Sequence, residues 1–212
     1  MTTTTKTPKT KTTKKKLLTK SGKYWVTWAN TNAKNSKLVS KLDSNFKKKY
    51  DAFSKALRDA GATVTVKSTR RHKNRAYLFH WCWKISLGKL GTTKISSIPR
   101  QAGVDIEWDH GDNKKSIAGA KEMRVKFGLA TPTSPKPSKV APSLTSNHIA
   151  GKAVDIEIKW KGKIKVKDKS GKEVEITYMS DVTKNKKLHA IGKSYGVKKH
   201  LTDTPHWSHT GR

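Results

Sequence analysis

The sequence is poor in cysteine, in acidic residues and in long apolar runs. Only one cysteine, Cys82, stands among 212 residues, so no intramolecular disulfide can form and nothing indicates an oxidising compartment. Cys82 lies in the apolar run 79–83, where we expect a buried side chain rather than a reactive thiol. No apolar run approaches the roughly 20 residues that a membrane span needs. Residues 1–11 show no apolar segment of a secretory signal, so action outside the cytoplasm would depend on release by another factor.

Acidic residues are far outnumbered by basic ones. The chain has 47 lysines and arginines against 15 aspartates and glutamates, which gives a formal net charge of +32. Such a charge implies an anionic partner, and DNA, RNA, lipopolysaccharide, teichoic acid and anionic lipid all qualify. The lysines are spread along the whole chain, and no nucleic-acid-binding motif appears among them. A nucleic-acid or polyanion-binding protein without catalysis is therefore the alternative rather than the leading hypothesis.

The composition divides the chain into an arm and a domain. Residues 1–22 consist almost entirely of Thr, Lys, Ser, Gly and Pro, which predicts a disordered basic arm. Residues 23–212 fit a single domain, whose ordered part begins near Trp25 and Trp28.

Apolar periodicity predicts an α+β fold, a small and mainly antiparallel sheet with helices packed on it. Apolar residues three and four apart predict helices over 36–60, 72–87, 113–127 and 182–195. Alternation predicts strands over 64–66 and 153–158, a hairpin of 164–166 with 174–176, and a last extended segment at 205–209. The stretch 88–112 is irregular, and 131–138 is a proline-rich loop.

One short segment carries a histidine and a carboxylate that can converge. It reads Ser-x-His-x-x-Gly-x-Ala-x-Asp over residues 146–155. In the strand that follows the glycine, period two places Val154 and Ile156 on one face and Asp155 on the other. Gly151 permits a tight turn that brings His148 back over the strand. Because zinc accepts imidazole nitrogen and carboxylate oxygen, His148 and Asp155 are candidate zinc ligands.

The C-terminal segment supplies the groups that this half-site lacks. Asp203-Thr-Pro-His206 offers a third ligand, His206, and an acid, Asp203, beside it. Zinc-bound water can have a pKa of about 7, and Asp203 is the candidate base that accepts its proton. Each residue alone has an ordinary alternative, a hydrogen-bonded histidine or a surface ion pair. The co-occurrence of all four favours one catalytic Zn²⁺.

Further residues are candidates for supporting roles. A fixed cation should stabilise the oxyanion of an amide hydrolysis, and Arg70 or Arg71 at a strand-to-helix junction can supply it; we prefer Arg70. Ser146, His209 and Arg71 are candidates for contact with substrate or with the ligands. The acidic stretch Asp105, Glu107, Asp109 and His110 is interpreted as a cleft wall or loop clamp rather than a second metal site.

These motifs resemble the M15 family of zinc peptidases, which includes D-alanyl-D-alanine carboxypeptidases and dipeptidases and the L-alanyl-D-glutamate endopeptidases of phage endolysins. The resemblance covers residues 36–210, including the helix after Arg70 with Ala76-Tyr-Leu78. It implies the hedgehog/D,D-peptidase-like fold, His148, Asp155 and His206 as zinc ligands, Asp203 as base and Arg70 as oxyanion arginine. The chain departs from the family at Arg75, where a glutamine often stands, and in a long insertion at about 88–144.

The resemblance implies a peptidoglycan-cleaving metallopeptidase, a hydrolase of the stem peptide or cross-link. An endolysin-like lytic enzyme fits the absence of a visible signal peptide, because such a monomeric enzyme waits in the host cytoplasm for holin-type release to the periplasm and cell wall. The basic arm would then contact anionic cell-envelope polymers. D-Ala-D-Ala, L-Ala-D-Glu and cross-bridge bonds, and phage or bacterial origin, all remain open.

Overall fold

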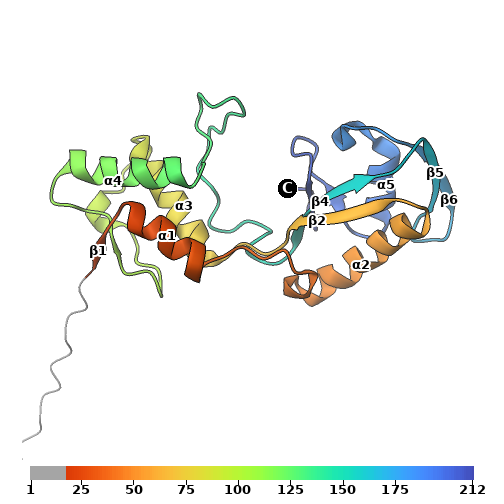
Figure 1. The fold of residues 1–212 in the computed structure, drawn as a ribbon, viewed down its shortest axis with the longest axis horizontal. Helices are drawn as coiled ribbons and strands as arrows, with labels where there is room; N and C mark the ends of the chain where they lie inside the picture. Colours follow the sequence, from red (N-terminus) through yellow and green to blue (C-terminus); the bar gives the residue numbers. More distant parts are fainter. Residues whose placement is uncertain (1–17) are drawn as a thin grey trace, which may run out of the picture.

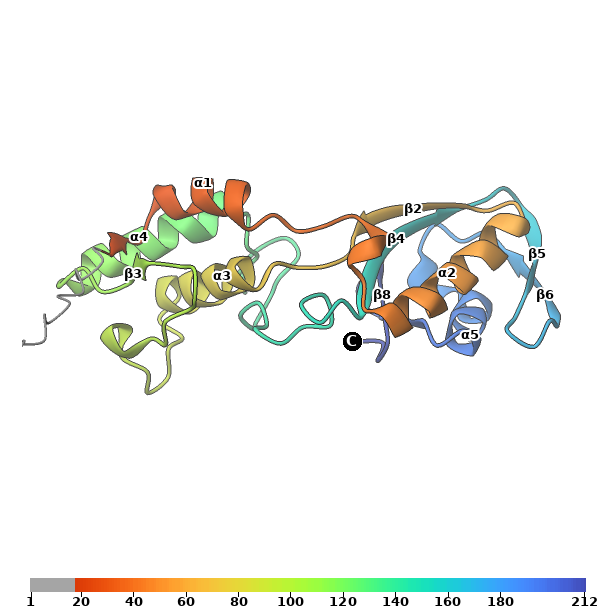
Figure 2. The same ribbon diagram turned by 90° about the horizontal axis from the view of Figure 1, so that it is seen from below.

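The computed structural model describes residues 18–212, which form two lobes joined by extended segments (Figure 1). We call them the helical lobe (α1, α3 and α4 with β1 and β3) and the sheet lobe (α2, α5, β2 and β4 to β8). The chain crosses between them three times, after α1, after β2 and after α4 (Figures 1 and 2). Each lobe has its own cluster of buried apolar side chains.

The helical lobe is built on three helices that pack around tryptophans. Its elements are β1 (Thr19–Lys20), α1 (Lys23–Asn32), α3 (Lys73–Ser86), the 3-10 turn Ile95–Ser97, β3 (Ile106–Glu107) and α4 (Asn113–Lys126). Trp25, Trp81 and Trp108 are buried at its centre, and the Trp108 indole N–H donates to the Tyr77 hydroxyl at 3.0 Å. Cys82 is fully buried there as expected, and burial raises the pKa of its thiol far above the ordinary value.

The sheet lobe is built on a four-stranded antiparallel sheet in the order β2-β4-β8-β7. Its strands are β2 (Thr63–Ser68), β4 (Ala153–Lys159), β7 (Lys198–Lys199) and β8 (His206–Ser208), and β5 (Lys163–Lys167) pairs with β6 (Glu173–Thr177) as a hairpin. The helices are α2 (Ser44–Asp59) and α5 (Lys186–Ser194), with 3-10 turns at Val39–Lys41 and Val182–Lys184. One apolar face, with Phe53, Ile156 and Trp207, forms the core.

The α+β class and the antiparallel sheet are therefore confirmed, but several predicted boundaries differ. The helix predicted over 36–60 begins only at Ser44, because the Asp43 side chain accepts the Phe46 N–H at 3.1 Å and caps it there. The segment before it forms a separate 3-10 turn. The last predicted helix likewise begins at Lys186, where Asn185 caps α5.

The described end of the predicted arm and part of the predicted insertion both belong to the helical lobe. Residues 1–17 of the arm lie outside the described residues, whereas Thr19 and Lys20 form β1 against β3. The Trp25 indole N–H donates to the Thr19 carbonyl at 3.1 Å, which fixes this strand on α1. Within the insertion, α4 packs on α1 and α3. The insertion thus shares its core with residues that precede it, and the single-domain boundary at 23–212 stays a prediction.

Candidate metal centre

Strand register brings Asp155 and His206 together. Val154, Ile156 and Ile158 of β4 are buried in the core, which leaves Asp155 on the opposite face, as its alternation predicted. Asp155 is paired directly with His206 of β8, and Val154 with Trp207. Side chains of directly paired residues lie on the same face of an antiparallel sheet. His206 therefore stands beside Asp155, with Nδ1 3.2 Å from Oδ1.

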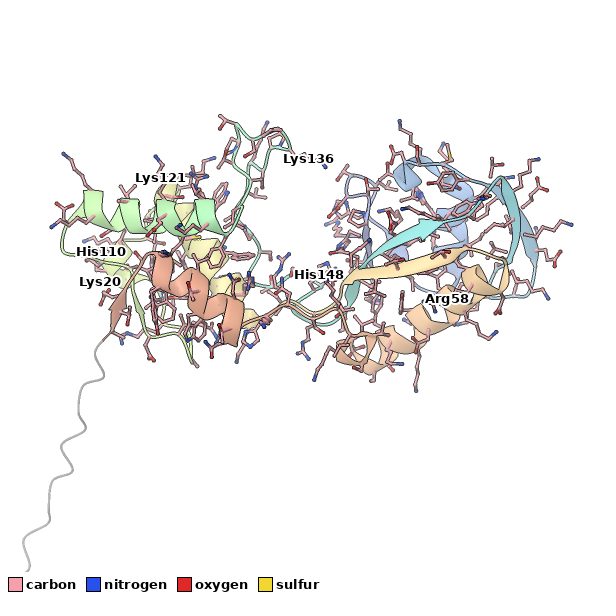
Figure 3. All side chains as sticks on the ribbon, in the orientation of Figure 1. Lys20, Arg58, His110, Lys121, Lys136 and His148 are labelled. Carbon is pink, nitrogen blue, oxygen red and sulfur yellow. The ribbon has the colours of Figure 1, made fainter. Side chains whose placement is uncertain are left out.

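His148 reaches the same point from the turn before β4. Its main-chain carbonyl accepts the Arg71 N–H at 3.0 Å, and its ring Nδ1 lies 2.5 Å from the Thr69 carbonyl oxygen. Thr69 is itself fully buried. The β2–α3 connection thus holds both the backbone and the ring of His148, and its Nε2 lies 3.2 Å from Asp155 Oδ1 and 3.1 Å from His206 Nδ1. Figure 3 places His148 at the end of the sheet lobe that faces the helical lobe.

The atoms that converge here are all hydrogen-bond acceptors in the neutral imidazole state. A carbonyl only accepts, so His148 Nδ1 carries a hydrogen for Thr69, and His206 Nε2 carries one for the Arg212 main-chain oxygen at 3.2 Å. The inward atoms, His148 Nε2 and His206 Nδ1, then present lone pairs to an Asp155 oxygen. Such a set is satisfied either by added protons or by a metal ion, and a metal-binding histidine commonly donates its other ring N–H to a carbonyl group.

The spacing of these atoms suits a small tetrahedral ion. The ligand atoms of His148, Asp155 and His206 all lie within 4.8 Å of one another, and both histidines are buried. Zinc bonds of about 2.0–2.1 Å in a tetrahedral arrangement separate neighbouring ligand atoms by about 3.3 Å. The separations of 3.1 and 3.2 Å are close to that value. The residues present therefore fit a Zn²⁺ ion with three protein ligands.

Electrostatics keep the Asp155 carboxylate ionised. Burial alone would raise the pKa of Asp155, but His148 and His206, which donate hydrogen bonds to it and carry positive charge when they are protonated, lower it by more. The pKa of Asp155 is therefore held well below its ordinary value. An ionised carboxylate is the form that binds a metal ion.

Gly151 permits the turn that carries His148, and it also touches α2. It has φ +71°, and its carbonyl accepts the Asp43 N–H at 2.9 Å. A Cβ atom at this position would lie 2.8 Å from the Asp43 nitrogen. The glycine is thus needed for its backbone conformation and for a close approach between the His148 turn and the start of α2.

We expect Gly151→Ala to destabilise the sheet lobe by about 2–4 kcal/mol, because backbone strain adds to a steric clash. Gly162→Ala is the matched control in the same lobe, since Gly162 has φ +60° but no atom within 4 Å of its added Cβ. Its cost should be about 1 kcal/mol, from φ alone. Urea unfolding of both variants measures the difference, and equal losses would show that the contact with Asp43 is unimportant.

The two candidate arginines differ in their surroundings. Arg70 is exposed, and its Nε donates to the Ile149 carbonyl at 3.4 Å. Arg71 is half-buried, and its Nε is buried without a hydrogen-bond partner. Burial lowers the pKa of Arg71, while the negative charge of Asp155 raises it. Arg71 is therefore the more buried of the two, and its charge interacts with that of the candidate ligand Asp155.

Asp203 lies in the exposed loop between β7 and β8, three residues before His206. Its main-chain carbonyl accepts the His206 N–H at 3.1 Å, which makes a tight turn into β8. Its carboxylate does not belong to the group of three candidate ligands.

The loop of Asp203 is held by a buried lysine, Lys199, which no sequence pattern predicted. Lys199 is only 5% exposed, and its ammonium donates to the carbonyls of His200, Asp203 and His206 at 2.9, 2.5 and 3.0 Å. It also lies 5.5 Å from the centre of the Trp207 ring. Burial lowers the pKa of Lys199 to about 8, against the attraction of Asp203 and other carboxylates. One buried ammonium group thus holds the main chain of both Asp203, the candidate base, and His206, a candidate ligand.

The other candidates are placed as follows. Ser146 accepts the Ile149 N–H at its carbonyl, and its hydroxyl is buried without a partner. His209 is exposed, and its N–H donates to the Lys152 carbonyl at 2.9 Å. His200, which was not predicted, has its ring centre 5.5 Å from that of His206.

The acidic stretch lies in the helical lobe, apart from the candidate ligands. The Glu107 carboxylate accepts the Asp109 N–H at 3.2 Å, and the Asp109 carboxylate accepts the Gly111 N–H at 2.8 Å. His110 Nε2 is 2.9 Å from the Ser21 hydroxyl. Over residues 18–212, the one group of histidine and acid side chains with metal-ligand spacing is that of His148, Asp155 and His206. These bonds support the loop-clamp interpretation of the stretch.

Comparison with models of known protein families and with curated protein sequences gives no match to this chain. Among the described residues, no helix has the length and apolar character that crossing a membrane requires.

Proposed function

We propose that the protein is a zinc-dependent peptidase that hydrolyses an amide bond in the stem peptide or cross-link of bacterial peptidoglycan, with an M15-like fold. The observation that carries the proposal is the convergence of two imidazole nitrogens and one carboxylate oxygen at 3.1–3.2 Å, with the outer nitrogens of both rings bonded to main-chain oxygens. Three ligands with His and Asp chemistry leave one coordination position for water, as in catalytic zinc sites.

The chain's own residues supply the remaining roles. When bound, zinc would lower the pKa of a water molecule and polarise a carbonyl group. Asp203 would accept the proton, because it is exposed and its loop turns directly into His206. For the oxyanion we now favour Arg71 over Arg70, because the Arg71 charge interacts with Asp155.

The net charge of +32 supports a cell-wall substrate, because cell-envelope polymers are anionic. An endolysin-like role follows, in which a monomer reaches the wall after release from the host cytoplasm. The same charge supports the alternative, a polyanion-binding protein without catalysis. Metal content separates the two, because a polyanion binder has no need of one equivalent of zinc.

The decisive test is digestion of purified peptidoglycan with and without a chelator. We expect release of soluble peptides that stops with chelator and returns with zinc. Asp203→Asn should retain zinc but lower turnover by about 10²–10⁴-fold, the usual contribution of a general base. Unimpaired cleavage by Asp203→Asn would contradict the assignment of the base, and metal-free protein that zinc does not reconstitute would favour the polyanion binder. Mass spectrometry of the fragments identifies the bond.

A further inference from the structure

A basic cavity lies at the junction of the two lobes, next to the candidate metal centre. Its volume is about 390 Å³, and it is formed where the segment after α1 runs beside the segment between β2 and α3 (Figures 1 and 2). The lining residues are Lys34, Ser36, Lys41, Arg70, Arg71, His72, Lys73 and Ile149. Five of these are cations, and none of the described residues that line it is acidic.

The frame of the cavity is fixed by main-chain bonds between the two segments. The Ser36 N–H donates to the Arg70 carbonyl at 2.8 Å, and the Thr69 N–H donates to the Ser36 carbonyl at 2.8 Å. The His72 N–H donates to the Asn35 side chain at 3.2 Å. The cations are therefore attached to a paired backbone and not to two independent loops, so their close approach is built into the fold.

The positive charges in this region oppose one another. Burial and then the charges of Lys73 and Arg70 lower the pKa of His72. Burial and the charge of Arg71 lower the pKa of Arg75, one turn along α3. Like charges held together cost free energy, which an oxyanion would offset through charge-assisted hydrogen bonds. The N-terminus of the 14-residue α3, where His72 is the cap, adds a favourable dipole.

The cavity is connected to the metal centre through two neighbours of the ligands. Ile149, in its wall, follows His148 directly, and the Arg71 N–H donates to the His148 carbonyl at 3.0 Å. The cavity wall is thus bonded directly to the backbone of one candidate ligand. We propose that this cavity binds a carboxylate group of the substrate next to the scissile amide. The identity of that ligand depends on the proposed function, whereas oxyanion binding by the cavity does not.

Binding to the resting protein tests the cavity without any catalysis. The affinity for glutarate is measured by isothermal titration calorimetry for three proteins. These are the wild type, the cavity variant Lys34→Glu/Lys41→Glu and the control variant Lys48→Glu/Lys121→Glu. The last pair changes two exposed lysines outside the cavity and gives the same net charge. We expect at least about fivefold weaker binding for the cavity variant and less than about twofold weakening for the control. Equal weakening in both would overturn the proposal, because net charge alone would then explain binding.

Inorganic phosphate, titrated in the same way, distinguishes the source of the oxyanion. Glutarate binding at least as tight as phosphate binding supports a carboxylate ligand. Phosphate binding without glutarate binding would overturn that assignment in favour of a phosphoryl group.

Activity provides a second and separable test. Two peptides that differ only by a carboxylate or carboxamide beside the scissile bond are compared by kcat/KM, with zinc content measured for each variant. The wild type and the control variant should prefer the carboxylate, and the cavity variant should lose that preference. An unchanged preference in the zinc-loaded cavity variant would overturn the proposal. If the wild type cleaves neither peptide, the proposed function fails, while calorimetry still decides whether the cavity binds an oxyanion.

Discussion

His148→Ala should lower zinc affinity by at least about 100-fold and abolish peptidoglycan hydrolysis. Loss of a group that only hydrogen-bonds to a ligand already lowers metal affinity by about 10–100-fold, and His148 supplies a ligand atom itself. Its removal leaves only the Asp155 oxygen and His206 Nδ1, 3.2 Å apart, which is one protein ligand fewer than a catalytic zinc site needs. Zinc content after dialysis and calorimetric zinc titration measure the change.

A second histidine variant controls for adventitious binding. His80 is in α3 of the helical lobe and is far in sequence from the candidate ligands. Its Nδ1 lies 2.9 Å from the Pro142 carbonyl. His80→Ala should keep one equivalent of zinc and its activity. If His148→Ala also keeps both, the metal centre assigned to these three residues is wrong.

Lys199→Met should destabilise the sheet lobe by about 1–3 kcal/mol, because three carbonyls lose a charged donor. It should also weaken zinc binding by about 10–100-fold, as expected for a group that positions a ligand. Methionine has a similar length and stays apolar, so packing against Trp207 is largely retained. Urea unfolding gives the stability, and zinc titration gives the affinity.

The neighbouring lysine provides a matched control. Lys198 precedes Lys199 in β7 but is exposed, so Lys198→Met changes the same charge without touching the loop. It should leave stability and zinc affinity nearly unchanged. Lys199→Arg, which keeps a charged donor, should recover part of the zinc affinity. If Lys198→Met and Lys199→Met behave alike, the loop is held by other contacts and Lys199 has no positioning role.

Local patterns were sufficient to propose His148 and Asp155 as candidate ligands. Alternation in 153–158 fixes the direction of Asp155, and that direction is confirmed by the burial of Val154 and Ile156. Gly151 predicted a tight turn that brings His148 back over the strand, and the structure shows φ +71° at this glycine. The direct pairing of Asp155 with His206 depends on strand register over 51 residues of sequence, which no local pattern contains.

Lys199 and the choice between Arg70 and Arg71 could not be predicted in the same way. In a chain with 47 basic residues, no single lysine or arginine stands out by its type. Whether one of them is buried depends on which side chains surround it after folding. The three carbonyls around Lys199 belong to a loop whose shape follows from the β7–β8 pairing.

The fold was predicted best where apolar periodicity was regular. The helices over 72–87 and 113–127 and the 164–166/174–176 hairpin agree with α3, α4 and β5–β6. Helix α1 was not predicted, because two threonines and two asparagines, which have low helix propensity, lie among and after its apolar residues. β1 lies in a segment of Thr, Lys and Ser that has no apolar signal, and its pairing with β3 spans 87 residues.

The two separate cores decide which part of the molecule responds to metal. All three ligands belong to strands and turns around the first core, and none comes from the α1–α3–α4 core. A ligand that binds only native protein stabilises the cooperative unit that contains its binding residues. Zinc bound at the proposed site would therefore stabilise the sheet lobe and leave the stability of the helical lobe unchanged. Intrinsic tryptophan fluorescence reports on both, since Trp25, Trp81 and Trp108 lie in one core and Trp160 and Trp207 in the other.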